Sequence, residues 1–251
     1  MSADFVLEAF NLRREFKGFV AVRDVNLKIR RGSIHALIGP NGAGKTTVFN
    51  LITKFLKPTS GRIIYDGTDI TAEKPAQIAR RGLVRSFQIS ATFPHLTVLQ
   101  NVRVALQRKA GLATQLWLSE RVLTRLNGRA GELIEAVNLQ DYIHTEAAEL
   151  SYGRKRALEF ATTLALEPTV LLLDEPMAGM GHEDIDRIAQ LVQQAAVGRT
   201  ILMVEHNLSV VSRLCDTISV LQRGEIVAEG NYATVSADPR VREAYLGTEV
   251  G

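Results

Sequence analysis

The sequence predicts an α/β fold in which an inserted helical block interrupts a core of alternating strands and helices. Short apolar runs of strand length alternate with helical patterns near both ends of the chain. Between about residues 90 and 150 the strand runs disappear, and apolar residues follow the spacing of amphipathic helices. The length of 251 residues and a hydrophobic fraction of 46% suit one large core with an appendage.

The first part of the chain is predicted to contain short strands and one helix. Strand-forming residues are concentrated at Phe5–Leu7, Val25–Ile29, Ser33–Ile38 and Gly61–Tyr65. A helix is expected from about Gly44 to Leu56, because a proline and a glycine follow and end it. This order places a buried strand directly before a glycine-rich segment and a helix directly after it.

The last part of the chain returns to alternating strands and helices. Strands are expected at Val170–Leu173 and Thr200–Val204, helices at Glu183–Ala196 and Asn207–Leu214, and a strand hairpin over Thr217–Ala228. The predicted domains are therefore an N-terminal β portion with the start of the core (1–89), a helical subdomain (90–160), and the rest of the core with a C-terminal hairpin and helix (161–251).

Composition limits the environment and the class of partner. The net charge of +3 is too small to indicate nucleic-acid binding by itself, and the pI of 9.1 is compatible with an anionic membrane face. The single cysteine, Cys215, excludes an internal disulfide framework and suits a reducing compartment. Because no leader and no membrane-spanning run is visible, we expect a cytoplasmic chain that needs another protein to cross a membrane.

The segment Gly39–Thr46 matches the phosphate-loop pattern G-x-x-x-x-G-K-[ST] in full, between a predicted strand and a predicted helix. Its glycines let backbone N–H groups turn toward phosphate oxygens, and the helix N-terminus adds partial positive charge. Lys45 can reach the β- and γ-phosphates, and the Thr46 hydroxyl can bind Mg²⁺. A glycine-rich turn with a chance lysine would lack this context. We assign nucleotide contacts to Gly39, Pro40, Asn41, Gly42, Ala43, Gly44, Lys45, Thr46 and Thr47.

Two carboxylates end the apolar strand that begins at Val170. Asp174 and Glu175 would lie at the carboxyl edge of a parallel sheet, where ligands bind in α/β folds. Asp174 can hold Mg²⁺ through a water molecule, and Glu175 can polarise a water for attack on the γ-phosphate. A turn that merely ends the strand is the alternative interpretation, and the complete phosphate loop argues against it.

A second helix start has the features of a phosphate-binding site. Ser151 precedes the predicted helix Ala157–Leu166 and can cap it, and Gly153 permits close approach of an anion to the backbone. The segment contains no lysine of the phosphate-loop type. An ordinary helix cap explains these residues equally well when the segment is considered alone.

Together these residues resemble the ATP-binding subunit of an ABC transporter, and the resemblance spans essentially the whole chain. In that family the segment at Ser151 is the signature motif, usually Leu-Ser-Gly-Gly-Gln, which completes the ATP site of a partner subunit. Tyr152 here replaces the first glycine and Arg154 the glutamine, whereas Ser151 and Gly153 remain. The resemblance implies a P-loop NTPase core with an antiparallel β subdomain and an inserted helical subdomain.

Further positions match the family in order along the chain. Gln88 matches the Q-loop glutamine, which links Mg²⁺ and the attacking water to the helical subdomain, and His206 matches the switch histidine that contacts the γ-phosphate. Phe16 fits the aromatic residue that stacks on adenine, although Phe10 and Phe19 lie nearby and any of the three could belong to the core. Gly181 departs from the acidic or amide residue usual in the D-loop.

Within the family, the chain most resembles the larger ATPase of branched-chain amino acid importers. The cues are the sequence after Lys45, the segment Val84–Gln88 and the tail Asp238–Gly247. Similar tails occur in lipopolysaccharide-export ATPases, so another transport system, such as that export or the import of urea or amides, remains an alternative.

The resemblance also implies partners and a location. We expect ATP and Mg²⁺ as ligands, transmembrane permease subunits, a second ATPase subunit (the same chain or a paralogue) in a head-to-tail sandwich, and a periplasmic binding protein in the same system. The chain would lie on the cytoplasmic face of the inner or plasma membrane. No recognisable nucleic-acid motif accompanies its basic residues, so nucleic acid is not an expected partner.

Two other function classes are weighed against transport. A soluble ABC-type ATPase acting on DNA or ribosomes usually has a long coiled coil or tandem ATPase halves, and neither occurs in this sequence. A small-molecule P-loop kinase would share Gly39–Thr46, but it would not need Gln88 or the segment Ser151–Gly153.

Overall fold

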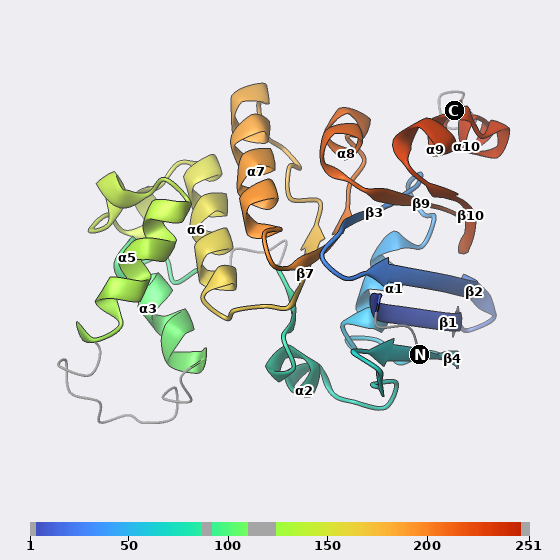
Figure 1. The fold of residues 1–251 in the computed structure, drawn as a ribbon, viewed down its shortest axis with the longest axis horizontal. Coiled ribbons are helices and arrows are strands. Elements are labelled where there is room, and N and C mark those ends of the chain that lie inside the picture. The colour runs from blue at the N-terminus through green and yellow to red at the C-terminus, as the bar shows by residue number, and fades with distance from the viewer. Residues whose placement is uncertain (1–3, 87–91, 110–123, 247–251) are drawn as a thin grey trace. The chain divides into compact units, whose positions relative to one another are not determined.

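The computed structural model describes residues 4–86, 92–109 and 124–246, which form two compact units (Figure 1). Unit 1 comprises Met1–Arg85, Thr169–Pro176 and Ala196–Gly251, and unit 2 comprises Ser86–Pro168 and Met177–Ala195. The domain boundaries at residues 89/90 and 160/161 divide the chain only by sequence order, and they stay a prediction.

A four-stranded antiparallel sheet forms one layer of unit 1, with the order β2-β1-β4-β5. Figure 1 shows β1, β2 and β4 side by side. The strands are β1 (Phe5–Phe16), β2 (Phe19–Arg30), β4 (Ser60–Tyr65) and β5 (Thr68–Asp69). Strands β1 and β2 are longer than the sequence predicts. Bulges interrupt their apolar alternation, but the two strands continue to pair through them.

The second layer is a six-stranded sheet with the order β10-β9-β3-β8-β7-β6, in which only β10 is antiparallel to its neighbour. Every residue of β3, β7 and β8 is buried, as expected for central parallel strands. The bounds are β3 (Ile34–Ile38), β6 (Leu83–Arg85), β7 (Val170–Asp174), β8 (Thr200–Val204), β9 (Thr217–Gln222) and β10 (Glu225–Gly230).

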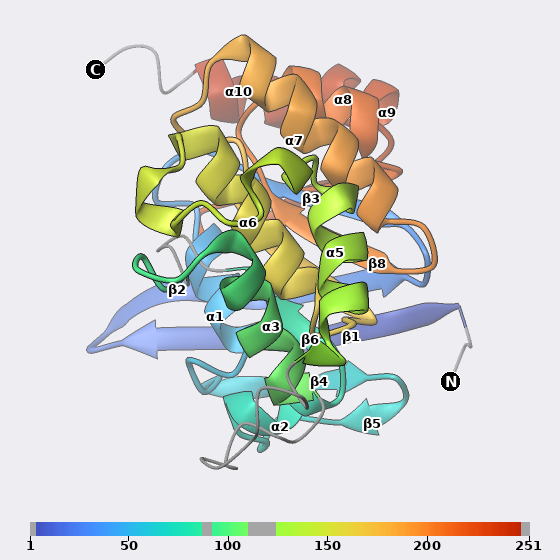
Figure 2. The same cartoon turned by 90° about the vertical axis from the view of Figure 1, so that its left-hand side faces the viewer.

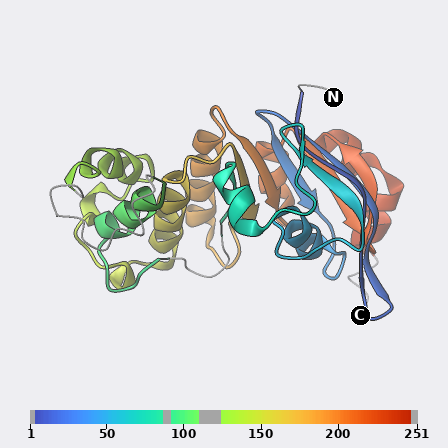
Figure 3. The same cartoon turned by 90° about the horizontal axis from the view of Figure 1, so that it is seen from below.

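Helix α1 (Lys45–Ile52) lies between the two sheets (Figure 3). Its residues Val48, Phe49, Leu51 and Ile52 are fully buried and belong to one apolar cluster with side chains from both sheets. Burial of this kind contributes about 1.5–3 kcal/mol for each large apolar side chain. The phosphate-loop segment is therefore attached to a helix that is buried in the apolar core of unit 1.

The predicted extension of this helix to Leu56 is wrong, because the chain turns at Lys54. Thr53 is the C-cap, and Lys54 adopts the left-handed conformation with φ 64°, where its N–H donates to the carbonyl of Leu51 (3.2 Å). The Lys54 side chain is buried, its Nζ has no hydrogen-bond partner among the described residues, and burial lowers its pKa, although Asp69 and Glu73 oppose the shift.

We expect Lys54→Gly to raise the free energy of unfolding by about 1 kcal/mol, because glycine adopts the left-handed conformation without strain and no buried ammonium remains. Denaturant unfolding would measure the change. Lys17→Gly is the matched control, because Lys17 has φ 47° but is exposed. If Lys54→Gly raises the free energy of unfolding no more than Lys17→Gly does, the buried ammonium does not destabilise the fold.

Unit 2 is helical, and α3 (Val98–Lys109), α5 (Asn127–Ala136) and α6 (Tyr152–Leu164) pack against one another (Figure 2). Helix α7 (His182–Ala195) packs on α6, and short 3₁₀ turns occur at Gln140–Tyr142 and Ala147–Glu149. The predicted exchange of strands for helices in the middle of the chain is confirmed for these residues.

Shorter elements complete unit 1: α2 (Pro75–Arg80), α8 (Leu208–Leu214), α9 (Tyr232–Ala237) and α10 (Pro239–Leu246). The predicted hairpin over Thr217–Ala228 is present as β9 and β10. Helix α2 and strand β5 were not anticipated from the sequence. Among the described helices, none combines the length and apolar character needed to cross a membrane.

Candidate functional site

The predicted chemical groups of unit 1 converge at one edge of the six-stranded sheet. Strands β3, β8, β7 and β6 are adjacent and parallel, so their carboxyl ends meet there. Gly39 follows β3, His206 closely follows β8, and Glu175 directly follows β7. Ligands of open α/β sheets bind at this kind of edge.

The loop after β3 depends on its glycines. Gly39 has φ 153° and Gly44 has φ 105°, conformations that side chains rarely adopt. A Cβ at Gly39 would lie 2.1 Å from the carbonyl oxygen of Leu221, and one at Gly44 would lie 2.6 Å from that of Ala21. The backbone therefore follows a path that only glycine permits, pressed against β9 and β2.

Lys45 extends back over this loop. Its Nζ donates to the carbonyl oxygens of Gly39 (2.7 Å) and Pro40 (3.0 Å), and the residue is only 8% exposed. Burial lowers the pKa of Lys45, and the nearby carboxylates of Glu175 and Asp174 oppose that shift. The structure thus brings the lysine and both strand-end carboxylates into one electrostatic environment.

The start of α1 fits an anion. Gly44 is its N-cap and supplies no capping side chain, and no acidic residue occupies the first turn. The N-terminal amides and their partial positive charge are therefore not neutralised locally. Of the remaining predicted contacts, Ala43 is buried, Pro40 and Thr47 are partly buried, and Asn41, Gly42 and Thr46 are exposed.

The two carboxylates differ in environment. Asp174 is the last residue of β7 and is 4% exposed, whereas Glu175 is partly buried. Glu175 adopts the left-handed conformation with φ 46°, and its N–H donates to the carbonyl of Val204 (2.9 Å). A non-glycine residue held in this conformation stores strain of about 1–3 kcal/mol, which is common at functional sites.

His206 is exposed at the end of β8, and its backbone is held by its neighbours. The fully buried Glu205 accepts hydrogen bonds from the N–H groups of His206 (3.1 Å) and Asn207 (3.3 Å). The Asn207 side chain in turn caps α8 by accepting from the N–H groups of Ser209 and Val210. Glu205 and Asn207 were not singled out from the sequence, although an asparagine before an apolar helical run is a cap signal.

Arg85 is the functional-site residue that sequence reasoning missed. It ends β6, and its guanidinium donates to Oδ2 of Asp174 and to Oδ1 of Asn50, the latter at 2.6 Å. The sequence analysis assigns Arg85 no role beyond its place in the segment Val84–Gln88. No pattern could reveal the pair, because the partners lie 89 and 35 residues away along the chain.

The donor set fits hydrated Mg²⁺ better than a metal caged by protein. The described residues contain no cluster of three His, Cys, Asp or Glu side chains able to hold a metal. Mg²⁺ typically takes one or two protein oxygens, several waters and substrate phosphates. The Asp174 carboxylate and the Thr46 hydroxyl are oxygen donors of this kind.

The remaining predicted residues outside unit 2's helix start are Gln88 and Phe16. Gln88 lies outside the described residues, so its role stays a prediction. Phe16 is 38% exposed at the end of β1, opposite Phe19, and the Arg14 guanidinium lies 4.5 Å from its ring centre. Phe19 is 67% exposed. The Phe10 ring is covered by the Arg62 guanidinium, which lies 4.9 Å from its centre. Phe16 and Phe19, on either side of the turn, are therefore the candidates for stacking on a base.

In unit 2, α6 begins at Tyr152, directly after Ser151 and earlier than the predicted start at Ala157. Ser151 is the N-cap, but its side chain makes no capping hydrogen bond. Tyr152 donates from its hydroxyl to the carbonyl of Ala178 (3.2 Å), which ties the signature segment to the segment after Met177. The Arg154 guanidinium lies 4.1 Å from the centre of the Tyr142 ring.

Gly153 is buried against α7. A Cβ at this position would lie 2.5 Å from Oδ1 of Asp184, so glycine is required for the present position of that carboxylate. We expect Gly153→Ala to lower the free energy of unfolding in the native background and to raise it in an Asp184→Ala background, with a coupling of about 1–2 kcal/mol. A double-mutant cycle in denaturant measures the coupling.

Gly131→Ala provides the control, because Gly131 lies in α5 and a Cβ there would meet nothing within 4 Å. This substitution should stabilise the chain by up to about 1 kcal/mol through helix propensity alone. Equal effects at Gly131 and Gly153 would contradict the proposed steric role of Asp184.

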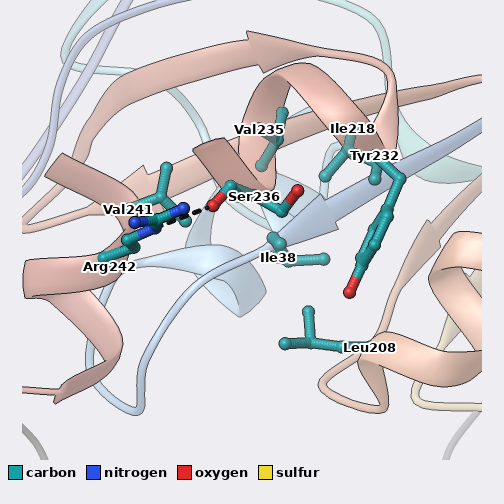
Figure 4. A pocket seen from close by; sticks show the side chains of 8 residues that line it. All are labelled: Ile38, Leu208, Ile218, Tyr232, Val235, Ser236, Val241 and Arg242. Carbon is teal, nitrogen blue, oxygen red and sulfur yellow. Dashed lines mark hydrogen bonds between the residues drawn. The ribbon is translucent and has the colours of Figure 1, made fainter. Parts of the chain in front are cut away.

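A separate apolar cavity of about 260 Å³ lies in unit 1 (Figure 4). Its only charged lining residue is Arg242, whose Nε donates to the carbonyl oxygen of Ser236 (3.1 Å). Such a lining does not suit phosphate, so this cavity is not the nucleotide site. Its walls are Ile38, Leu208, Ile218, Tyr232, Val235, Ser236, Val241 and Arg242.

Comparison with known families and proteins agrees with this arrangement. The ABC transporter family model matches residues 22–178, and the model described as branched-chain amino acid ATP-binding cassette transporter matches residues 225–251. The chain is 36% identical over 249 residues to the high-affinity branched-chain amino acid transport ATP-binding proteins BraF of Pseudomonas aeruginosa and LivG of Escherichia coli. Each alignment covers 96% of this chain and 98% of the relative.

Solved structures resemble the chain over the same extent. The ADP conformation of an ATP-binding cassette from an ABC transporter superimposes with a TM-score of 0.84 at 30% identity, covering 97% of this chain and 99% of that one. A dimeric bacterial ABC transporter cassette gives a TM-score of 0.75 at 25% identity, covering 90% of this chain and 98% of the other.

Proposed function

The chain belongs to the ATP-binding subunits of ABC transporters, and from this premise we propose that it hydrolyses MgATP at the edge of its six-stranded sheet to power the import of branched-chain amino acids. ATP binding and hydrolysis coupled to transport are the activity of this family. The predicted fold class, a P-loop NTPase core with antiparallel β and helical parts, is confirmed.

The convergence of Lys45, Asp174 and Glu175 is the observation that supports the proposed site most directly. Lys45 and the amides at the start of α1 would offset charge on the transferring phosphoryl group. Glu175 would accept a proton from the attacking water, and His206 would contact the γ-phosphate. Bound Mg²⁺ would neutralise phosphate charge, held by Asp174 and Thr46, with Gln88 as a further predicted ligand.

The second phosphate-facing helix start supports a head-to-tail pair of subunits. Helix α1 begins with Lys45, whereas α6 follows Ser151, contains the buried Gly153 and has no equivalent lysine at its start. Each α6 would complete the ATP site of the other subunit. The related bacterial cassette that was solved as a dimer is consistent with such a pairing.

A loop of unit 2 suits docking on a permease. Residues 92–97 precede α3, and the buried Asn101 organises them: its Nδ2 donates to the carbonyls of Phe93, Leu96 and Thr97, and its Oδ1 accepts from the N–H of Phe93. The Phe93 side chain is nevertheless 52% exposed. A rigid loop with an exposed aromatic is a reasonable contact for a membrane partner on the cytoplasmic face, in a system that includes a periplasmic binding protein.

Uptake in cells that lack the gene tests the substrate. Loss of the gene should reduce uptake of radiolabelled leucine, isoleucine and valine, and the native chain should restore it, whereas Glu175→Gln should not. Uptake of lysine serves as the control. Normal leucine uptake without the gene, together with a defect in urea uptake or lipopolysaccharide export, would replace the proposed substrate and keep the ATPase.

A further inference from the structure

The ion pair between Arg85 and Asp174 sits where the proposed function needs a metal. Arg85 and Asp174 expose only 12% and 2% of their side chains. One arm of the guanidinium binds Oδ2 of Asp174, and the other binds Asn50, which belongs to α1. The arginine thereby joins β6, β7 and the phosphate-binding helix.

A buried carboxylate is costly unless it is paired, and removing one partner of a buried pair is strongly destabilising. In the structure Asp174 has Arg85 as its direct partner and Lys45 as a second cation nearby. The two cations stabilise the charge of Asp174 when no metal is present. They also weaken the attraction of Asp174 for a divalent cation, because like charges repel.

We propose that Arg85 is a resident cation that positions Asp174 and competes with Mg²⁺ for it, so that Arg85 sets the Mg²⁺ concentration the site requires. The guanidinium holds Oδ2 and fixes the side-chain conformation, which leaves the other oxygen, Oδ1, for a metal-bound water. This inference rests on the proposed function. Arg85 is a positioning residue, because it acts through Asp174 and not on the nucleotide.

The position of Arg85 in the chain adds a second consequence. Arg85 is the last residue of unit 1 before the chain enters unit 2 at Ser86. Its contacts with Asp174 and Asn50 therefore anchor the chain at the point where it leaves the nucleotide site. If a bound metal weakens the Arg85–Asp174 pair, the backbone at Arg85 and Ser86 loses this anchor.

The test compares full-length variants by the Mg²⁺ concentration that gives half of the ATP-dependent thermal stabilisation, starting from EDTA. Binding of Mn²⁺ in the presence of ATP, followed by electron paramagnetic resonance, provides a direct second readout. For Arg85→Gln we expect the half-saturating concentration of either metal to fall by about three- to tenfold, the effect of removing one screened neighbouring charge. Its loss of stability should be larger in EDTA than with saturating MgATP.

Two further variants separate charge from structure. Arg85→Lys keeps the positive charge and should keep a metal requirement close to that of the native chain, even if stability falls. Asn50→Asp gives the guanidinium a competing carboxylate partner and should shift the metal requirement in the same direction as Arg85→Gln. If Arg85→Gln does not fold, Asn50→Asp still tests the proposal.

Arg81→Gln is the matched control, because Arg81 forms an exposed bidentate pair with Glu73. It should not alter the metal requirement. If the metal requirement is unchanged in Arg85→Gln or Asn50→Asp while ATP binding is intact, Arg85 has only a structural role and the inference is overturned. Failure of the native chain to bind ATP would instead overturn the proposed function.

Discussion

Glu175→Gln should reduce the rate of ATP hydrolysis by about 10²–10⁴-fold, the contribution expected of a general base. The amide keeps the size of the side chain but cannot take a proton from water. Lys45 and the start of α1 are untouched, so ATP binding should persist. The proposed head-to-tail dimer should accumulate in ATP, because in that proposal its subunits would separate only after hydrolysis.

Phosphate release, nucleotide binding and the molar mass in ATP measure these three outcomes. Glu167→Gln is a close control, because Glu167 also has a positive φ, 49°, but precedes β7 and does not follow it. A folded Glu175→Gln variant that no longer binds ATP would show that Glu175 is not the hydrolytic base. Equal loss of activity in Glu167→Gln would show that the effect is not specific to the carboxylate at the end of β7.

Lys45→Ala should reduce ATP affinity by about 10²–10⁴-fold, since each hydrogen bond to a charged group contributes about 1.5–3 kcal/mol and two phosphate contacts are lost. The overall fold should persist, because the hydrogen bonds of Nζ in the described structure go to the carbonyls of Gly39 and Pro40, and Asp174 keeps its direct partner Arg85.

Titration with a fluorescent ATP analogue measures the affinity, and the unfolding midpoint verifies the fold. Lys57→Ala, at an exposed lysine after the same helix, should leave both values unchanged. Native affinity in Lys45→Ala would remove this lysine from the nucleotide site.

Motifs formed by consecutive residues can be predicted from the sequence, whereas side-chain contacts between segments far apart in the chain cannot. The loop from Gly39 to Thr46 and the pair Asp174–Glu175 contain their own signals, because each sits at the end of a buried strand. Arg85 had no such signal, since its function depends on which strand lies next to β6. The fold class followed from patterning in the same way, whereas the strand order required pairing across the whole chain.

The predicted ends of helices and strands are wrong where local backbone geometry, and not residue composition, decides where an element begins or ends. Charged residues such as Arg13 and Arg14 concealed the length of β1, which continues through its bulges by pairing with β2 and β4. Lys54 ended α1 early by adopting a conformation that the sequence pattern assigns to glycine. Helix α6 begins earlier than the apolar spacing indicates, because its first five residues include Arg154, Lys155 and Arg156.

The position of β3 in its sheet has a consequence for synthesis on the ribosome. β3 ends at Ile38, yet its two neighbours, β8 and β9, begin at Thr200 and Thr217. The strand that presents the phosphate loop therefore has no sheet partner until most of the chain has been translated. Such non-local pairing slows folding and leaves apolar edges exposed in the meantime. The nascent chain should acquire its affinity for nucleotide late, in the last steps of its folding, and should depend on chaperones until then.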